Sequence, residues 1–156
     1  MNEVSMIGFD TAKNVFQLHG VDANGDCKLV RRLKRREVLP FFKKQSACTV
    51  ALEACGASHY WAREISALGH EVKLVPPPFV KCFAEGRRKN DARDAKALAF
   101  AGRSKDLRPV PVKTAERQAE LLLIKARSLL VRQHTQTGNA LLWPSRRVRP
   151  HRQVRR

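Results

Sequence analysis

The sequence has 156 residues, enough for one domain with a moderate core and an appended helix. It carries 31 lysines and arginines against 14 acids, which gives a net charge of +17, and 43% of its residues are hydrophobic. The hydrophobic fraction excludes a chain that is disordered over most of its length. The charge indicates a polyanionic partner, above all a nucleic acid.

Several patterns argue against a secreted, membrane or zinc protein. The start, MNEVSMIGFD, has an acid beside a short apolar run, which is typical of neither a signal peptide nor a membrane span. No basic stretch forms a clear lipid-facing helix. The cysteines form no C-x-x-C pair, so we expect buried thiols in a reduced, cytoplasmic protein. They are Cys27, Cys48, Cys55 and Cys82.

The first third of the sequence predicts strands. Residues 4–10 (VSMIGFD) form a strand that ends on an acid, and residues 15–21 (VFQLHGV) alternate with the period of a second strand. Asn24-Gly25 predicts a hairpin to a shorter strand, CKLVRR, because both central residues of such a turn need positive φ. We therefore expect a three-stranded antiparallel meander.

The middle of the sequence predicts a parallel β-α-β unit. After a short helix over 35–45, the apolar run 48–54 (CTVALEA) predicts a strand buried on both faces. A helix follows, capped by Ser58 and ended by Gly69, before a strand over 71–75. Three residues of this helix are expected to face the core: Trp61, Ile65 and Leu68.

The remaining sequence predicts an irregular basic segment over 79–90, a helix over 91–102, an extended stretch over 105–113 and a long helix from Thr114 to about Thr137. The apolar stripe of the long helix comprises Ala119, Leu122, Leu123, Ala126 and Leu130. We divide the chain into a domain over 1–112, a basic helix over 113–140 and an arginine-rich tail over 141–156, which we expect to lack packed structure.

Four acids stand at positions suited to chemistry. Asp10 and Glu53 lie at the ends of predicted strands, and Asp91 and Asp94 open a helix three residues apart. Neighbouring strand ends bring their side chains together, and helix residues three apart share a face. A cluster of carboxylates repels itself unless a hard cation such as Mg²⁺ or Mn²⁺ binds. Two such ions can activate a nucleophile and stabilise a leaving oxygen at phosphorus.

Simpler interpretations of these acids stay open on spacing alone. Asp10 can start a turn, Asp91 can cap a helix, and Asp94 is favourable to the dipole in a first helical turn. Glu53 fits a structural role least, because a carboxylate in a buried run is costly unless it is paired or bound to metal.

The runs MIGFDTAKNVFQLHGVD, ALEACGASHYWAREISALGHEVKLVPPPFVK and KNDARDAKALA are similar to transposases of the IS110 family, which includes the pilin-gene inverting recombinases. The stretch PVKTAERQAELLLIKARSLLVRQHTQTGNAL resembles the helical region that follows in that family. The resemblance runs from about residue 5 to residue 142. It implies an α/β, RNase H-like fold of the RuvC resolvase type, with a mixed sheet, flanking helices and a long basic C-terminal helix.

The resemblance also implies a function. It places the family's Asp-Glu-Asp-Asp tetrad on Asp10, Glu53, Asp91 and Asp94, and so implies Mg²⁺ binding, with DNA strand cleavage and exchange in transposition. DNA is the implied partner, together with a structured guide RNA, and the family assembles as multimers on DNA. We expect phosphate contacts from residues that flank the acids or lie on the long helix, although a solvated charged face explains them as well. They are Lys13, Arg87, Arg88, Lys89, Arg93, Lys125, Arg127 and Arg132.

The family pattern ends after Leu142, before the second domain whose serine is the nucleophile in that family. We expect a decayed, truncated copy that does not complete recombination alone, and Ser145 of the tail is not a nucleophile candidate. The alternative is a non-catalytic nucleic-acid-binding remnant, which metal binding would distinguish. IGFDTAKN also resembles a phosphate loop of sugar kinases, but the second glycine-rich loop that ATP binding requires does not appear.

Overall fold

The computed structural model describes residues 3–11, 15–83 and 91–147, and the side chains of residues 91–92 and 143–147 lie outside that description. The chain forms two compact units that divide between Thr114 and Ala115, two residues after the predicted boundary. Each unit is described separately.

The first unit is built on one mixed sheet with the strand order β3-β2-β1-β4-β5. β1 pairs antiparallel with β2, and β2 with β3, whereas β1, β4 and β5 are parallel neighbours. This topology confirms the predicted meander and β-α-β unit, and it is the RNase H-like α/β arrangement. The strands are β1 (Met6–Asp10), β2 (Val15–Val21), β3 (Cys27–Lys34), β4 (Thr49–Glu53) and β5 (Glu71–Val75).

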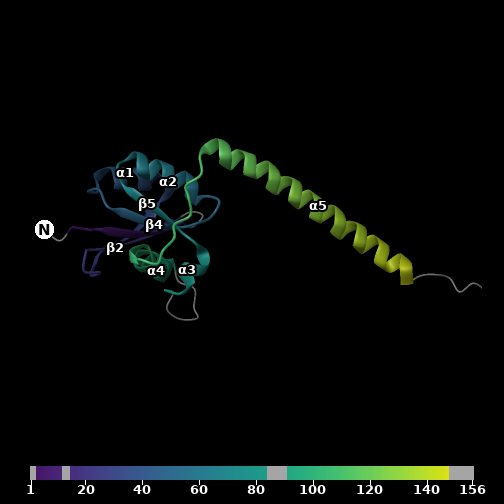
Figure 1. Cartoon of the computed structure of the whole chain (residues 1–156), viewed down its shortest axis with the longest axis horizontal. Coiled ribbons are helices and arrows are strands. Elements are labelled where there is room, and N and C mark those ends of the chain that lie inside the picture. Colours follow the sequence, from purple (N-terminus) through teal and green to yellow (C-terminus); the bar gives the residue numbers. More distant parts are fainter. Residues whose placement is uncertain (1–2, 12–14, 84–90, 148–156) are drawn as a thin grey trace, which may run out of the picture. The chain divides into compact units, whose positions relative to one another are not determined.

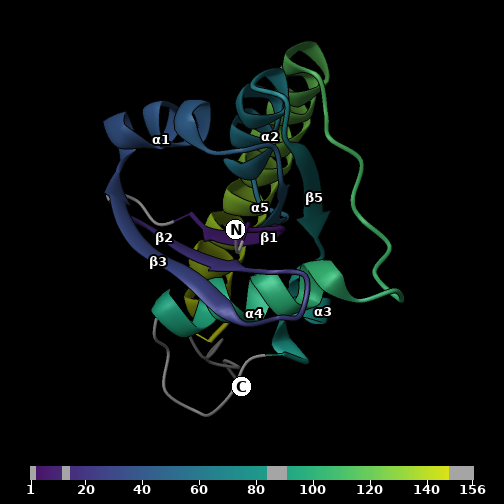
Figure 2. The same ribbon diagram turned by 90° about the vertical axis from the view of Figure 1, so that its left-hand side faces the viewer.

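Helices cover both faces of the sheet, with α1 and α2 on one side and α3 and α4 on the other (Figures 1 and 2). We call these the α1/α2 face and the α4 face. The elements are η1 (Arg35–Glu37), α1 (Val38–Lys44), α2 (Ser58–Ala67), α3 (Pro77–Lys81), α4 (Asp91–Arg103) and, in the second unit, α5 (Ala115–Arg147).

The α1/α2 face is packed with large side chains. Phe9 of β1 lies 5.4 Å from the Phe16 ring, 5.7 Å from the Phe42 ring and 6.2 Å from the Trp61 ring, measured between centroids. All four residues are at most 3% exposed. Because apolar burial stabilises a fold in proportion to the area removed from water, this face holds the main core.

The β2–β3 turn differs from the predicted two-residue hairpin. Gly25 has a φ of 100°, but no described residue other than glycine has positive φ, so the prediction for Asn24 was wrong. The turn is held by Asp22, whose Oδ1 accepts the backbone N–H groups of Asn24, Gly25 and Asp26 at 2.9, 3.0 and 3.0 Å. Burial alone would raise the pKa of Asp22, but hydrogen bonds from the Asp26 N–H, Lys28 and the Asn24 N–H lower it overall.

The helices around the β-α-β unit show three further differences. Ser58 does not cap α2 but lies in its first turn, where its hydroxyl donates to the Cys55 carbonyl oxygen at 2.9 Å. Leu68 is 37% exposed, because α2 ends at Ala67 and Gly69 follows with a φ of 93°. The start of the segment predicted to be irregular is helical, since a proline at N1 of α3 needs no N–H partner.

The chain leaves the first unit along β5 and α2. Val110 forms an antiparallel bridge with Leu74 of β5. The Lys113 N–H donates to His59 Nδ1 at 3.2 Å, and Arg63 Nη1 donates to the Lys113 carbonyl oxygen at 2.6 Å. The residues just before α5 are therefore fastened to the globular unit.

Helix α5 begins directly after Thr114 and continues to Arg147, ten residues beyond the predicted Thr137 and into the segment predicted to lack packed structure. Its predicted leucine stripe is exposed, with Leu122, Leu123 and Leu130 at 67%, 73% and 65%. Among the described helices, none has the length and hydropathy needed to cross a membrane.

Candidate functional site

Asp10 and Glu53 lie at the same end of two neighbouring parallel strands. The β1–β4 register pairs Gly8 with Ala51 and Phe9 with Leu52, so Asp10 and Glu53 are the next pair along. Adjacent strands are about 4.8 Å apart. The backbone therefore places both carboxylates side by side at what we call the carboxylate edge.

Both side chains belong to the α4 face. Side chains alternate along a strand, so Asp10 shares its face with Gly8, and Glu53 shares its face with Ala51. A Cβ built on Gly8 would clash with Ala95 and Ala99 of α4, and one built on Gly102 would lie 2.7 Å from the Ala51 Cβ. Small residues thus let α4 approach the two strands that carry the acids.

The direction of α4 brings the other two acids to the same edge. Ala95 and Ala99 lie over Gly8, whereas Gly102 lies against Met6, the first residue of β1, and against Ala51 of β4. The helix therefore runs antiparallel to β1, and its first residues lie toward the strand ends. Asp94 is half-buried directly before Ala95. Asp91 is the first residue of α4, and its side chain is outside the described ones.

The described side chains do not form a metal cluster. Within the described part of the chain, no three His, Cys, Asp or Glu side chains are close enough to hold one ion. Glu53 is also only half-buried, so the expectation of a carboxylate enclosed in the apolar run was wrong. It is the last residue of β4, and Val50, Ala51 and Leu52 before it are fully buried. The backbone thus brings the four positions to one edge, although the described side chains among them do not form a group of three metal ligands.

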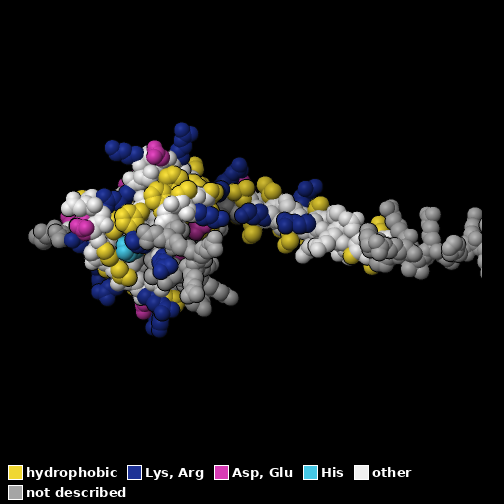
Figure 3. Space-filling model, turned by 90° about the horizontal axis from the view of Figure 1, so that it is seen from below, with side chains coloured by type: hydrophobic (Ala, Val, Ile, Leu, Met, Phe, Trp, Pro, Cys, Tyr) yellow, Lys and Arg dark blue, Asp and Glu magenta, His cyan; other side chains and the backbone are white. Residues whose placement is uncertain are grey.

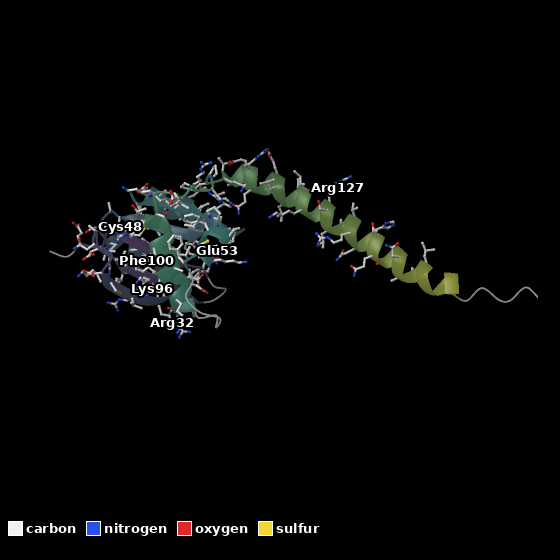
Figure 4. All side chains as sticks on the ribbon, turned by 60° about the horizontal axis from the view of Figure 1, so that its bottom comes forward. Arg32, Cys48, Glu53, Lys96, Phe100 and Arg127 are labelled. Atoms are coloured by element: carbon white, nitrogen blue, oxygen red, sulfur yellow. The ribbon has the colours of Figure 1, made fainter. Side chains whose placement is uncertain are left out.

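Polar and basic side chains surround this edge. Gln17 of β2 is paired with Asp10, and His19 with Gly8, so both lie on the α4 face. Burial lowers the pKa of His19, and the positive charge of Lys96 on α4 lowers it further. In Figure 4, Lys96 and Phe100 are labelled on α4, and Glu53 at the end of β4. Lys96 was not among the predicted site residues, although it follows Asp94 by two positions.

The predicted phosphate contacts have unequal outcomes. Arg93 is exposed on α4, and three more residues are exposed on α5: Lys125, Arg127 and Arg132. Figure 4 labels Arg127 on that helix. The other four predicted residues fall outside the described part of the chain: Lys13, Arg87, Arg88 and Lys89.

A basic stretch of β3 and η1 was missed by the sequence analysis. Six of the nine residues over 28–36 are lysine or arginine, and all six are exposed. The run of lysines and arginines was visible in the sequence. A sequence does not distinguish a charged strand that binds a ligand from one that only faces solvent. On the face shown in Figure 3, the globular unit displays more Lys and Arg than Asp and Glu side chains.

The prediction of buried thiols is wrong for three of the four cysteines, since Cys27, Cys55 and Cys82 are exposed. Cys55 Sγ lies 3.9 Å from Thr11 Oγ1, next to the carboxylate edge. Cys48 is buried in the α1/α2 core, and burial raises the pKa of its thiol to about 11. Its Sγ lies 3.5 Å from His70 Nδ1, and the other ring nitrogen of His70 is 2.9 Å from the Phe42 carbonyl oxygen. This pair is a satisfied core contact.

Comparisons with known proteins identify relatives over most of the chain. The IS110-type DEDD transposase family model, described as a transposase, matches residues 7–142. A Sinorhizobium fredii protein whose name describes a transposase is 48% identical over 141 residues, which are 90% of this chain and 36% of that protein. A Pseudomonas aeruginosa family 20 transposase is 48% identical over 136 residues, which are 87% of this chain and 40% of that protein.

The Yersinia enterocolitica transposase for insertion sequence element IS1328 is 36% identical over 141 residues, which are 90% of this chain and 42% of that protein. The chain therefore spans about two fifths of the length of these relatives. A solved structure of T. thermophilus RuvC in complex with Holliday junction substrate overlaps 67% of this chain and 98% of its own, with a TM-score of 0.43 and 14% identity.

Proposed function

The chain belongs to the IS110-type family of DEDD transposases, and from that premise we propose that it acts in metal-dependent cleavage and exchange of DNA strands during transposition. The proposed centre comprises Asp10, Glu53, Asp91 and Asp94. One observation carries the proposal. The β1–β4 register sets Asp10 beside Glu53 on the face that α4 covers, and α4 begins at the same edge with Asp91 and Asp94 in its first turn.

The donor chemistry of this edge suits a hard divalent cation. Carboxylate oxygens are the ligands that Mg²⁺ and Mn²⁺ prefer, and all four candidate donors are carboxylates. Without a cation these groups repel one another, and a bound cation would relieve that repulsion. When bound, the ion would supply charge stabilisation at a phosphate and an activated oxygen nucleophile. The residues themselves would hold the ion, while α4 fixes the positions of Asp91 and Asp94.

The proposal extends to the rest of the reaction. The proposal includes a second domain with a serine nucleophile, a structured guide RNA and assembly into multimers on DNA in the cytoplasm. These elements come from the family resemblance, and the chain spans 36% to 42% of the relatives described above. The residues described above should themselves bind metal and DNA.

Titration of the full chain with Mn²⁺ tests the centre. We expect saturable binding by calorimetry, weakened about 10-fold or more by Asp10→Asn, Glu53→Gln or Asp94→Asn, because each removes a charged ligand. Asp106→Asn is the matched control, since Asp106 is an exposed acid beyond the end of α4. Absence of saturable binding, or equal weakening by the control, would refute the metal centre.

The second candidate is a non-catalytic nucleic-acid binder. The exposed lysine and arginine side chains of β3, η1 and α5 favour it, because cations bind a phosphate backbone without a metal. A chain that binds DNA equally well with Mn²⁺ or with a chelator, and that shows no metal binding sensitive to Asp10→Asn, would support this function over the first.

A further inference from the structure

Four basic side chains line one end of the outermost strand of the sheet. We call them the basic rim: Arg32, Lys34, Arg35 and Arg36. β3 has a single neighbour, β2, and all four side chains are exposed. With Val15, the last three line an open depression of about 460 Å³.

The strand register connects the basic rim to the carboxylate edge. Gln17 of β2 is paired with Asp10 on one side and with Arg32 on the other. Arg32 is therefore level with Asp10, two strands away, at a backbone separation of about 10 Å. Directly paired residues share a face, so Arg32 and Asp10 both lie on the α4 face.

Helix α4 leaves strand β3 largely uncovered. The helix packs chiefly on β1 and β2, and also on β4. On β3, by contrast, Val30 lies in the same stripe as Arg32 and is 59% exposed. In Figure 4, Arg32 is labelled at the border of the globular unit. A ligand strand on β3 thus lies beside α4 and not beneath it.

The charges of the basic rim are available to a ligand. Within the described residues, none of its four members forms an ion pair with an acid. The nearest acid in sequence, Glu37, uses its Oε2 to accept the Lys34 backbone N–H at 2.8 Å. Lys28, in the same basic stretch, differs because it is paired with Asp22 at 3.3 Å.

Arg35 is held in place by aromatic rings. Its guanidinium carbon lies 5.1 Å from the Trp61 ring centroid and 6.0 Å from that of Tyr60. Stacking on a ring face leaves the N–H groups at the guanidinium edge able to donate. Tyr60 is 39% exposed beside it, so an aromatic surface borders the cations.

We propose that the basic rim binds the phosphodiester backbone of the DNA strand whose neighbouring segment lies at the carboxylate edge. This inference deepens the proposed function and rests on it. Arg32 and Lys34 are about 7 Å apart along one strand face, which presents cations in a line. A line of cations suits an extended nucleic-acid strand better than a compact anion, and Arg35 continues the line toward the exposed Tyr60 ring.

DNA binding by the full chain in EDTA tests the inference, because the chelator removes any contribution of a metal. The test variant is Arg32→Gln/Lys34→Gln/Arg36→Gln, which keeps Arg35 against Trp61. The control, Lys43→Gln/Lys44→Gln/Lys105→Gln, removes the same charge from other exposed positions of the unit. Fluorescence anisotropy with a labelled oligonucleotide, measured from 50 to 300 mM salt, gives the affinity and its salt slope, and thermal melting checks the fold.

We expect the rim variant to bind at least about 10-fold more weakly near 100 mM salt, and its log–log salt slope to fall by about 2 to 3, one unit for each lost phosphate contact. The control should retain most of its affinity. Equal losses in both variants, or a loss confined to an RNA oligonucleotide, would overturn the inference. The Mn²⁺ affinity of the rim variant should equal that of the unmodified chain, because the substitutions leave the carboxylates in place. Failure of the unmodified chain to bind DNA would instead refute the proposed function.

Discussion

The two faces of the sheet are packed in opposite ways. On the α1/α2 face, rings from β2, α1 and α2 each lie within about 6 Å of the Phe9 ring of β1. On the α4 face, Gly8, Ala51, Ala95 and Gly102 bring backbone against backbone. Large side chains remove more apolar surface from water, whereas small ones allow close approach.

The two faces therefore have different roles: one stabilises the first unit, and the other positions the acids of α4. The aromatic face supplies most of the free energy that holds the first unit together, and it carries no candidate site residue. The glycine–alanine face contributes less burial but fixes the start of α4, and with it Asp91 and Asp94, over the end of β1. We therefore expect mutations on the two faces to differ in what they damage.

The largest effect on stability should come from the aromatic face. Trp61→Ala removes a side chain that is 3% exposed and leaves a cavity among Phe9, Phe16 and Ile65. A loss of about 3–5 kcal/mol in the free energy of unfolding is expected. Urea denaturation measures it, with Leu68→Ala at a 37% exposed position as control. Similar losses for both variants would contradict the assignment of the core.

Gly8→Ala should have a smaller effect on stability and a larger one on the site. The new methyl group would meet Ala95 and Ala99 of α4, which is overpacking worth about 1–3 kcal/mol. Displacement of α4 would also weaken Mn²⁺ binding, by about 10-fold or more. Gly56→Ala is the control, because a Cβ there has no neighbour within 4 Å. Unchanged Mn²⁺ affinity in Gly8→Ala would show that the packing of α4 on Gly8 does not position the metal ligands.

Asp22 should contribute a modest, pH-dependent stability to the α4 face. Arg103 at the end of α4 donates to the Asp22 and Ala23 carbonyl oxygens at 3.0 and 2.7 Å, so the β2–β3 turn is attached to that helix. The pKa of Asp22 is lowered, so its contribution is present above the ordinary value of about 3.9 and is lost as the pH falls through the lowered value.

Urea midpoints of the unmodified chain and of Asp22→Ala should therefore differ most at pH 7, and the difference should narrow as the pH falls through the lowered pKa of Asp22. Asp22→Asn, which keeps an acceptor oxygen without the charge, should lie between them at pH 7. A difference that persists unchanged at low pH would assign the effect to packing instead of to the carboxylate.

The smallest expected effect concerns the reactivity of the Cys48 thiol. Its labelling rate measures how often the core of the α1/α2 face becomes accessible to solvent. Burial raises the pKa of Cys48 to about 11, so its thiol should stay protonated and unreactive at pH 8 in the native state. Cys27, Cys55 and Cys82 are exposed. A thiol-reactive reagent should label these three rapidly and Cys48 only after urea is added. Rapid native labelling of Cys48 would show that this face opens readily.

The strands and their order were predictable because local patterns determine them. Period-two alternation located β2 at its observed ends, and the apolar run 48–54 contained β4. The α4 helix was predicted to within one residue of its end. Asp10 and Glu53 could be assigned to one edge because parallel neighbours end together.

Other features depend on contacts between distant residues, which a local pattern does not encode. The exposure of Glu53 follows from where β4 ends, and that of Leu68 from the end of α2 one residue earlier. The close approach of α4 to Gly8 joins residues almost 90 positions apart. The position of the basic rim relative to the carboxylate edge could not be predicted, because it depends on the strand register that sets Arg32 level with Asp10.

The contacts of Lys113 with His59 and Arg63 define a cutting point for protein engineering. A fragment that stops at Pro109 would lose both these contacts and the Val110 bridge that shields the outer side of β5. A fragment that ends at Thr114 keeps them. A fragment of residues 1–114 thus retains the contacts of Val110 and Lys113 with the rest of the first unit. Fusion partners or crystallisation tags are best joined immediately after Thr114.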